Sequence, residues 1–352
     1  MRRILLAGDH FVLPRLFRAA LDEGGGATDV ELRDMMLPWP MEPFGDVENV
    51  QEASDVVDEL IAALDGVEIA LTQLAPFTER VFETRPELCF IGVCRGGPVN
   101  VDLEAATRAG VVVSSAPGRN AQAAAEYTIG LMLAAMRRIP AADAELHAGT
   151  WRGDYYTFAN AGLEFGASTV GLIGLGAIGR IVARILRAFG AIVLVYDPYA
   201  NRDDLDAVGA RAVELDELLA ASQVVSIHAR LTAETFHLLN AGNLSLLPEG
   251  AVLVNSARGA LLDYEPLPGL LRSGRLGALA LDVYDIEPPG QGWPLLTAPN
   301  VVLSPHLAGA TRETAIRAAR IAATSALQYL NGERPDHVAN PEVYERTSLG
   351  AP

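Results

Sequence analysis

The chain has 352 residues, half of them apolar, and a formal net charge of −17 at pH 7. This length and composition allow two domains, each with its own hydrophobic core. The negative charge argues against nucleic acid or an anionic membrane surface as a partner, because both would repel the protein.

The N-terminal run MRRILLAGDHF resembles a signal peptide for only a few residues, since its apolar part ends at Gly8. No uncharged apolar stretch is long enough to span a membrane, so we expect no membrane partner. The only cysteines, Cys89 and Cys94, offer no pair of metal ligands and little reason for a disulfide. We therefore expect reduced thiols, no metal site and a cytoplasmic location.

In chain order, short strands and helices alternate from the start, which predicts a small α/β unit. The residue pattern predicts strands at 4–7, 67–72, 89–93 and 111–114 and a helix at 13–21. A long helix rich in leucine and alanine follows at 121–138. We interpret its apolar stripe as core or as dimer surface.

A second α/β unit begins near residue 169. Strands are expected at 169–173, 191–195, 223–227, 251–255, 277–281 and 301–303, and an amphipathic helix at 311–330. If this last helix returns to the first unit, the substrate domain is discontinuous, with residues 1–117 and 308–352. Residues 118–307 then form the inserted cofactor domain, and the cleft between the two domains is the expected site.

The segment GLGAIG follows the predicted strand at 169–173 and carries three glycines, Gly174, Gly176 and Gly179. The first glycine allows a tight turn, the second a close approach of a pyrophosphate to the backbone, and the third close packing of helix on sheet. The helix that begins near Ala177 directs free amides and its positive dipole end at that pyrophosphate. This context predicts a dinucleotide site.

Asp197 ends the next predicted strand, 18 residues after Gly179. A carboxylate there binds both ribose hydroxyls and repels a 2′-phosphate, which favours NAD over NADP. Arg202 lies nearby and is the one residue that could soften this preference.

Three later motifs bring an arginine, carboxylates and a histidine to the same region. They are NSARG with Arg258, LDVYDIEP with Asp282 and Glu287, and SPHLAG with His306. Together with VDLEAATRAGVVV, AAAEYTIGLML, YDPY and VSIHARLTAET they make the chain resemble the D-isomer-specific 2-hydroxyacid dehydrogenases from about residue 93 to 309.

The resemblance implies an α/β fold of two domains, with a Rossmann-type parallel-sheet NAD-binding domain inserted in a smaller flavodoxin-like substrate domain. It also implies a homodimer. In this family Arg258 would bind the substrate carboxylate, His306 would be the acid/base, and Glu287 would orient His306 and raise its pKa.

The resemblance places further residues around the two ligands. Cofactor-lining positions are Thr128, Gly174, Gly176, Ala177, Ile178, Gly179, Asp197, His228, Ala229, Arg230, Ser256, Ala257, Asp282 and Gly309. The loop with Arg95, Gly96 and Gly97 would hold the substrate carboxylate through its amides, beside Arg258 and His306.

Plainer interpretations remain open for several of these residues. Arg258 could be a surface arginine after a strand, His306 a structural histidine after a proline, and Glu287 a turn cap. His228 could be catalytic rather than a wall of the cofactor pocket. His10, at the end of the first strand, could contact the substrate or have only a structural role in its loop.

The chain also departs from the family pattern. The substrate loop has the sequence RGGPVN, and we hypothesise that Arg95 binds a phosphate or second carboxylate on the substrate. Arg230 stands where the family usually has proline, and could pair with a cofactor phosphate or be solvated. Pro266 and Pro268 imply a displaced or shortened turn.

The sequence thus predicts reversible hydride transfer between NAD and C2 of a small D-2-hydroxy or 2-keto acid, with ketone reduction as the favoured direction. Two alternatives stay open. One is an NAD(H)-sensing binding protein of the corepressor type on the same scaffold, and the other is a phosphonate- or formate-type oxidase.

Overall fold

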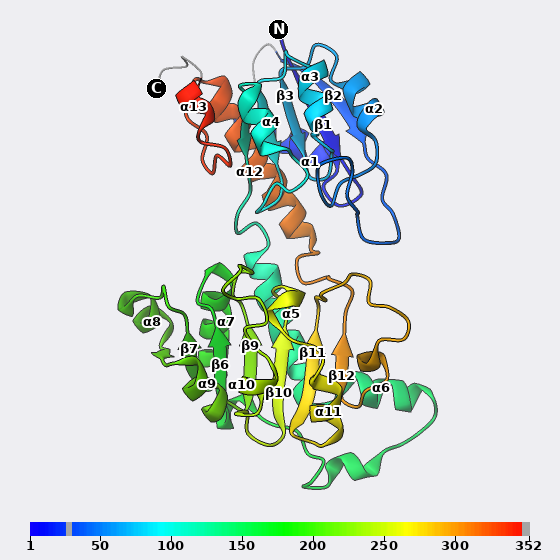
Figure 1. The fold of residues 1–352 in the computed structure, drawn as a ribbon, viewed down its shortest axis with the longest axis vertical. Helices are drawn as coiled ribbons and strands as arrows, with labels where there is room; N and C mark the ends of the chain where they lie inside the picture. The colour runs from blue at the N-terminus through cyan, green and yellow to red at the C-terminus, as the bar shows by residue number, and fades with distance from the viewer. Residues whose placement is uncertain (26–29, 347–352) are drawn as a thin grey trace. The chain divides into compact units, whose positions relative to one another are not determined.

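The structure, a computed structural model, describes residues 1–25 and 30–346 and divides into two compact α/β units (Figure 1). Unit 1 comprises Met1–Arg119 and the chain from Ala310 onward, and unit 2 comprises Asn120–Gly309. The sequence placed both boundaries two residues earlier, at 117/118 and 307/308.

Unit 1 contains a parallel five-stranded sheet in the order β2-β1-β3-β4-β5. Its strands are β1 (Arg2–Gly8), β2 (Val30–Met36), β3 (Ile69–Thr72), β4 (Phe90–Val93) and β5 (Val112–Ser114). This is the flavodoxin-like order, as predicted. The residue pattern did not predict β2, an edge strand whose residues are partly buried or exposed and form no clear apolar run.

Helices cover both faces of this sheet because alternate side chains of each strand point to opposite sides. Leu5 and Ala7 of β1 lie in one core, while Ile4 and Leu6 lie in the other. The helices of unit 1 are α1 (Pro14–Glu23), α2 (Val57–Ala63), α3 (Glu79–Thr84), α4 (Leu103–Arg108), α12 (Arg312–Leu330) and α13 (Val343–Arg346).

Helix α12 returns the C-terminal part of the chain to unit 1. Thr311 caps its start, accepting a bond from the Thr314 amide at 3.1 Å. A row of alanines lets the helix lie close to the sheet, and a Cβ added to Gly92 would stand 3.2 Å from the Ala322 carbonyl oxygen.

Unit 2 contains a parallel seven-stranded sheet in the order β12-β11-β10-β9-β6-β7-β8. Its strands are β6 (Thr169–Ile173), β7 (Ile192–Tyr196), β8 (Arg211–Ala212), β9 (Val224–Ile227), β10 (Ala251–Asn255), β11 (Leu276–Leu281) and β12 (Val301–Leu303). The order from β8 to β11 is that of the Rossmann fold, which confirms the predicted fold class.

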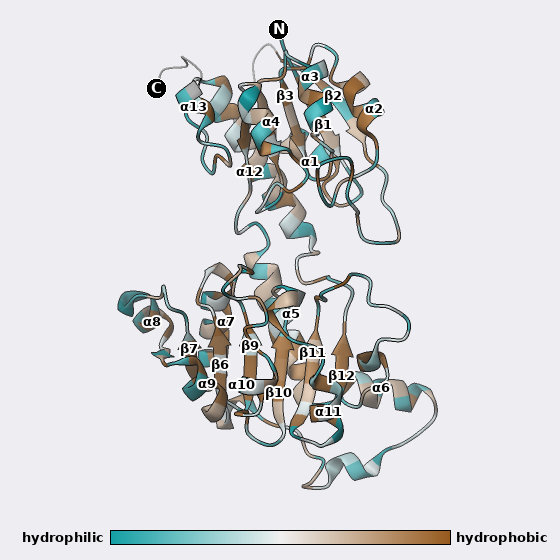
Figure 2. Cartoon of the chain, viewed as in Figure 1, coloured by the Kyte–Doolittle hydropathy of each residue, from teal (hydrophilic) through white to brown (hydrophobic). Residues whose placement is uncertain are grey.

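The strands of unit 2 are largely hydrophobic because both faces of the sheet are covered (Figure 2). Val252 and Val254 of β10 pack into the core that contains α5 and α7, and Leu253 packs into the opposite one. The helices are α5 (Ala121–Met136), α6 (Ile139–His147), α7 (Ala177–Ala188), α8 (Arg202–Val208), α9 (Leu215–Ala221), α10 (Ala241–Leu244) and α11 (Leu267–Arg272). Short 3₁₀ turns are η1 (Gly153–Tyr156), η2 (Phe165–Ala167), η3 (Gly259–Leu261) and η4 (Pro294–Leu296).

The predicted helix at 121–138 is α5, which ends at Met136, and a separate helix, α6, begins at Ile139. Arg138 adopts a left-handed conformation, with φ of 53°, between α5 and α6. Ten residues of α5 are buried, whereas α6 has no buried residue. The apolar stripe of α5 is therefore core. Helix α11 has only six residues; Pro266 is its N-cap and Pro268 lies in its first turn.

Within the described part of the chain, no helix is both long enough and apolar enough to cross a membrane.

Candidate active site

The predicted site residues of unit 2 follow the carboxyl ends of neighbouring strands. Arg258 follows β10, Asp282 and Glu287 follow β11, and His306 follows β12. These three strands are adjacent and parallel, so their carboxyl ends meet at one edge of the sheet. The glycine motif follows β6 at the same edge.

The glycine motif has the geometry that its sequence predicts. Gly174 has φ of 102°, and a Cβ there would lie 2.8 Å from the His228 carbonyl oxygen. A Cβ on Gly179 would lie 2.3 Å from the Gly174 carbonyl oxygen. Around Gly176, the N-cap of α7, no described atom lies within 4 Å of the Cβ position. The turn is thus closed on its inner side and open where a diphosphate would approach the helix N-terminus.

Asp197 lies directly after β7 and is bound to the same turn. Its Oδ2 accepts a bond from the Leu175 amide at 2.7 Å, and its Oδ1 accepts one from the Tyr199 amide at 2.9 Å. Each carboxylate oxygen can accept a further bond, so both ribose hydroxyls can still be bound. Arg202 instead pairs with Asp206 and its side chain is 91% exposed.

His306 and Glu287 form the hydrogen bond that the proposed acid/base pair requires. His306 Nδ1 lies 2.8 Å from Glu287 Oε2, and Glu287 Oε1 accepts a bond from the Tyr284 amide at 3.1 Å. His306 has φ of 54°, a left-handed conformation that is uncommon for a residue with a side chain and is typical of functional loops.

The two groups shift each other's ionisation. The Glu287 carboxylate raises the pKa of His306, against burial, which lowers it. Burial raises the pKa of Glu287, but the hydrogen bond and charge of His306, the Tyr284 amide and Arg258 together lower it below its ordinary value. The arrangement favours an imidazolium beside a carboxylate.

Arg258 is exposed, and one guanidinium nitrogen donates to the Ala257 carbonyl oxygen at 2.6 Å. The next residue, Gly259, presses on the chain after β11: a Cβ there would lie 2.0 Å from the Tyr284 carbonyl oxygen. This contact holds Arg258 beside the loop that carries Glu287, close enough to affect the pKa of Glu287 and His306.

Asn255 is a site residue that the sequence motifs did not predict. It is fully buried at the end of β10, where its Oδ1 accepts a bond from the Ala257 amide and its Nδ2 donates to the Arg258 carbonyl oxygen. The side-chain amide therefore fixes the backbone turn that presents Arg258. The only sign of this role in the sequence is that Asn255 directly precedes the motif SARG, which contains Arg258.

Asp282 holds the loop of His306. It is fully buried; Oδ1 accepts bonds from the Ser304 hydroxyl at 2.7 Å and the Leu307 amide at 2.8 Å, and Oδ2 accepts one from the Ala308 amide at 2.8 Å. Asp282 thus positions the residues on either side of His306. Its predicted contact with cofactor stays a prediction.

Thr128 and Ser256 link α5 to the end of β10. Their hydroxyl oxygens are 2.7 Å apart, and Thr128 also donates to the Ala124 carbonyl oxygen. A Cβ on Gly309 would lie 2.9 Å from the Asn120 side-chain nitrogen. The other predicted cofactor positions on unit 2 differ in exposure: Ala177 and Arg230 are exposed, while Ile178, Ala229 and Ala257 are partly buried.

His228 packs at the end of β9, with Nε2 3.0 Å from the Ser226 hydroxyl. Burial lowers the pKa of His228 to about 4, so the ring is neutral at pH 7. A neutral, bound ring agrees with a wall of the pocket better than with an acid/base.

The predicted substrate loop, with Arg95, Gly96 and Gly97, lies in unit 1 after β4. Among the described residues, nothing accepts a hydrogen bond from the amides of Gly96 and Gly97. These free donors suit an anion. That Gly96 and Gly97 bind the same substrate as Arg258 and His306 of unit 2 stays a prediction. His10 is exposed on unit 1 after β1.

No group of three or more histidine, cysteine, aspartate or glutamate side chains in residues 1–25 and 30–346 could hold a metal ion.

Comparison with known proteins identifies the family. Residues 129–308 match the family "D-isomer specific 2-hydroxyacid dehydrogenase, NAD binding domain". The chain is 36% identical to a glyoxylate reductase of Aeropyrum pernix, over 95% of this chain and 96% of that protein. It is 37% identical to a D-3-phosphoglycerate dehydrogenase of Archaeoglobus fulgidus over 78% of this chain, but spans only 52% of that longer protein.

Solved structures show the same architecture. The TT0316 protein of Thermus thermophilus superposes with a TM-score of 0.77 at 31% identity, covering 96% of this chain and 100% of that one. The chain belongs to the D-isomer-specific 2-hydroxyacid dehydrogenase family and is an NAD-dependent oxidoreductase.

Proposed function

We propose that the chain interconverts a small D-2-hydroxy acid and its 2-keto acid, with Arg258, Glu287 and His306 as its catalytic residues. The observation that carries this proposal is the 2.8 Å hydrogen bond between His306 Nδ1 and Glu287 Oε2, beside an arginine from the adjacent strand.

The cofactor site fits NAD. The open space around Gly176 and the free N-terminal amides of α7 suit the diphosphate, and the remaining acceptor sites of Asp197 suit the ribose. Bound there, the cofactor would supply the hydride acceptor for C2 of the hydroxy acid and, in its reduced form, the hydride donor for the keto acid.

His306 moves the proton. Its Nδ1 faces Glu287, and no described group occupies its Nε2, so Nε2 is the atom that exchanges a proton with the substrate oxygen. Reduction uses the imidazolium as acid, and oxidation uses the neutral ring as base. Because Glu287 raises the pKa of His306, the acid form persists to higher pH than in free histidine.

Arg258 binds the substrate carboxylate. Its permanently charged, planar guanidinium uses one nitrogen for the Ala257 carbonyl and keeps its other N–H groups for the ligand. Asn255 and Gly259 hold the backbone that carries it. The amides of Gly96 and Gly97 are the donors that unit 1 offers to the same class of ligand.

The substrate is a short 2-keto acid such as glyoxylate or hydroxypyruvate. The likeness to a glyoxylate reductase along nearly the whole length of both chains supports this class. We infer a keto-acid reductase in a reducing cytoplasm. The buried, unpaired Cys94 and the partly buried Cys89 support that compartment, and the charge of −17 argues against nucleic acid as a partner.

The test is NADH consumption by the purified protein with glyoxylate, hydroxypyruvate, phosphohydroxypyruvate and longer 2-keto acids, each repeated with NADPH and with His306→Ala. Turnover that the variant lacks supports the proposal and ranks the substrates. Tight NADH binding without turnover of any acid contradicts it and favours a cofactor-sensing protein.

We also infer a homodimer formed through unit 2. Helix α6 has no buried residue, and Trp151, Tyr156 and Phe158 after it are 83%, 97% and 100% exposed. Exposed apolar side chains so close together in the chain are typical of an interface. Sedimentation velocity should give a dimer for the wild type and a monomer for the double variant Trp151→Ser/Phe158→Ser.

A further inference from the structure

The substrate loop of unit 1 contains an arginine, Arg95, whose positive charge is paired with a carboxylate of the same unit. Arg95 has a side chain only 19% exposed, and it forms an ion pair with Glu52, whose side chain is 59% exposed. A second guanidinium nitrogen donates to the Glu52 carbonyl oxygen at 3.1 Å. Both the carboxylate and the backbone of Glu52 therefore bind Arg95.

The segment that carries Glu52 is attached to the substrate loop itself. The Gln51 amide donates to the Val99 carbonyl oxygen at 2.9 Å, and Glu52 has a left-handed backbone with φ of 47°. The other side of the loop is held as well, because the Ala116 amide donates to the Arg95 carbonyl oxygen at 2.7 Å. Glu52 is thus held at the loop whose free amides belong to Gly96 and Gly97.

We infer that Glu52 is a specificity-determining residue, which neutralises Arg95 and so disfavours 2-keto acids that carry a second anionic group. The inference rests on the proposed function, in which the amides of Gly96 and Gly97 bind the substrate carboxylate. With Glu52 in place, the second anionic group of the substrate, a phosphate or carboxylate, meets an ion pair with no net charge. Without it, the same anion would meet a free guanidinium.

This reverses the role that the sequence suggested for Arg95. An arginine beside the substrate loop predicts recognition of a second anion, but the sequence does not show that a residue 43 positions earlier pairs with it. The two interpretations differ in what happens when both charges are removed.

The experiment measures kcat/KM for phosphohydroxypyruvate relative to hydroxypyruvate, two substrates that differ only in the phosphate. Glu52→Gln removes the charge but keeps an oxygen that can accept from Arg95. We expect the ratio to rise about tenfold, because an unscreened unit charge a few ångströms away contributes about that factor in a partly exposed site. Arg95→Gln leaves Glu52 unpaired, so the ratio should fall by a similar factor.

The double variant Glu52→Gln/Arg95→Gln separates the two interpretations. If the pair is neutral in its effect, the double variant returns to the ratio of the wild type. If Arg95 reads the second anion directly, the double variant keeps the low ratio of Arg95→Gln. That result, or an unchanged ratio in Glu52→Gln, overturns the inference.

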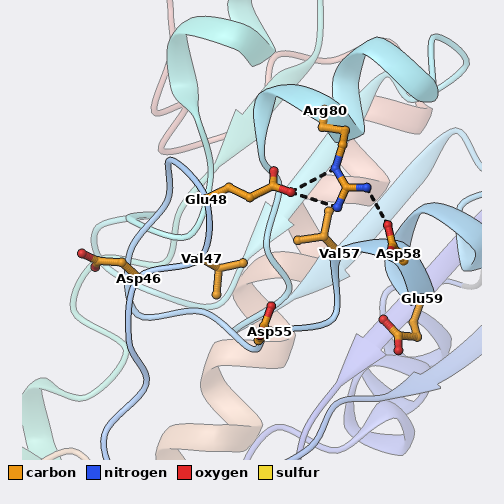
Figure 3. Close-up of a pocket in the computed structure, with 8 residues that line it drawn as sticks. All are labelled: Asp46, Val47, Glu48, Asp55, Val57, Asp58, Glu59 and Arg80. Atoms are coloured by element: carbon orange, nitrogen blue, oxygen red, sulfur yellow. Dashed lines mark hydrogen bonds and ion pairs between the residues drawn. The ribbon is translucent and has the colours of Figure 1, made fainter.

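Glu48→Gln is the matched control. Glu48 lies on the same segment, also has a positive φ, and pairs with Arg80, which Asp58 binds from the other side (Figure 3). These residues line a separate acidic cavity of about 360 Å³ in unit 1. Loss of this carboxylate should leave the substrate ratio unchanged.

A second measurement covers the case in which only glyoxylate is turned over. Competitive inhibition of glyoxylate reduction by tartronate relative to glycolate should then strengthen about tenfold in Glu52→Gln, and lose most of that gain at high salt. Failure of every 2-keto acid to react contradicts the proposed function, whereas turnover with the same selectivity in all variants contradicts only the inference.

Discussion

His306 Nδ1 lies 2.8 Å from Glu287 Oε2, although the two residues are 19 positions apart and follow different strands. The bond forms because β11 and β12 are adjacent and parallel, so their carboxyl ends lie side by side. Asp282 binds the amides after His306, and the left-handed backbone of His306 turns its ring toward Glu287. The pair is therefore built by sheet topology and one buried carboxylate.

Glu287→Gln should shift the pH dependence of reduction. The Glu287 carboxylate raises the pKa of His306, and reduction needs the imidazolium, so kcat/KM for a keto acid falls as pH rises through that raised pKa. Without the carboxylate the pKa drops, and the falling limb should move to lower pH. Oxidation needs the neutral ring, so its rising limb should move the same way. Profiles that stay in place would exclude Glu287 as the partner of His306.

Asp282→Asn should cost both stability and turnover. The substitution removes the charge that three donors share and places an amide donor against them, at a cost of about 2 kcal/mol in the free energy of unfolding. Denaturant unfolding measures this, and kcat should fall as His306 loses its position. Asp285→Asn, on the exposed turn after Tyr284, is the control and should change neither quantity.

Substitutions of Gly176 and Gly179 should separate the effect on NADH binding from the effect on folding stability. Gly176→Ala places a methyl group where no protein atom lies within 4 Å, so the protein should fold normally but bind NADH at least about tenfold more weakly. Gly179→Ala drives a methyl group against the Gly174 carbonyl oxygen and should lower stability as well. Fluorescence titration and thermal unfolding distinguish the two effects. Equal affinity for NADH in Gly176→Ala would place the diphosphate elsewhere.

Arg258→Lys should behave as a severe substitution. A lysine keeps the charge but loses the planar fork, so kcat/KM for 2-keto acids should fall about 100-fold while NADH binding is retained. Steady-state kinetics with glyoxylate measure this. Near-normal activity in the lysine variant would mean that Arg258 contributes only charge.

Local patterns in the sequence predicted what depends on neighbouring residues. The glycine turn and the strands that precede Arg258 and His306 follow from apolar runs and from polar residues at strand ends, whereas the strand order of both sheets was implied only by the family resemblance. The pattern could not reveal β2, whose partly exposed edge position requires no apolar run. It predicted α5 to within two residues of its end but did not predict α6, which begins after the left-handed Arg138.

The missed features of the site depend on hydrogen bonds that a motif does not show, two of them with partners far away in the sequence. The predicted place of Asp282 beside the cofactor stays a prediction, but its bonds to a segment more than 20 residues later were not predicted. Asn255 acts through the backbone of its own turn, which a motif match does not show. Glu52 lies in an irregular segment without sequence signal, and only the fold brings it to Arg95.

We propose that His306 exchanges the proton during reduction of a 2-keto acid. The most direct test compares NADH-dependent reduction of glyoxylate and hydroxypyruvate by the wild type and by His306→Gln, with NADH affinity measured in both. We expect a fall in kcat of about 10²- to 10⁴-fold with unchanged NADH affinity. Reduction at the wild-type rate by the variant would contradict it.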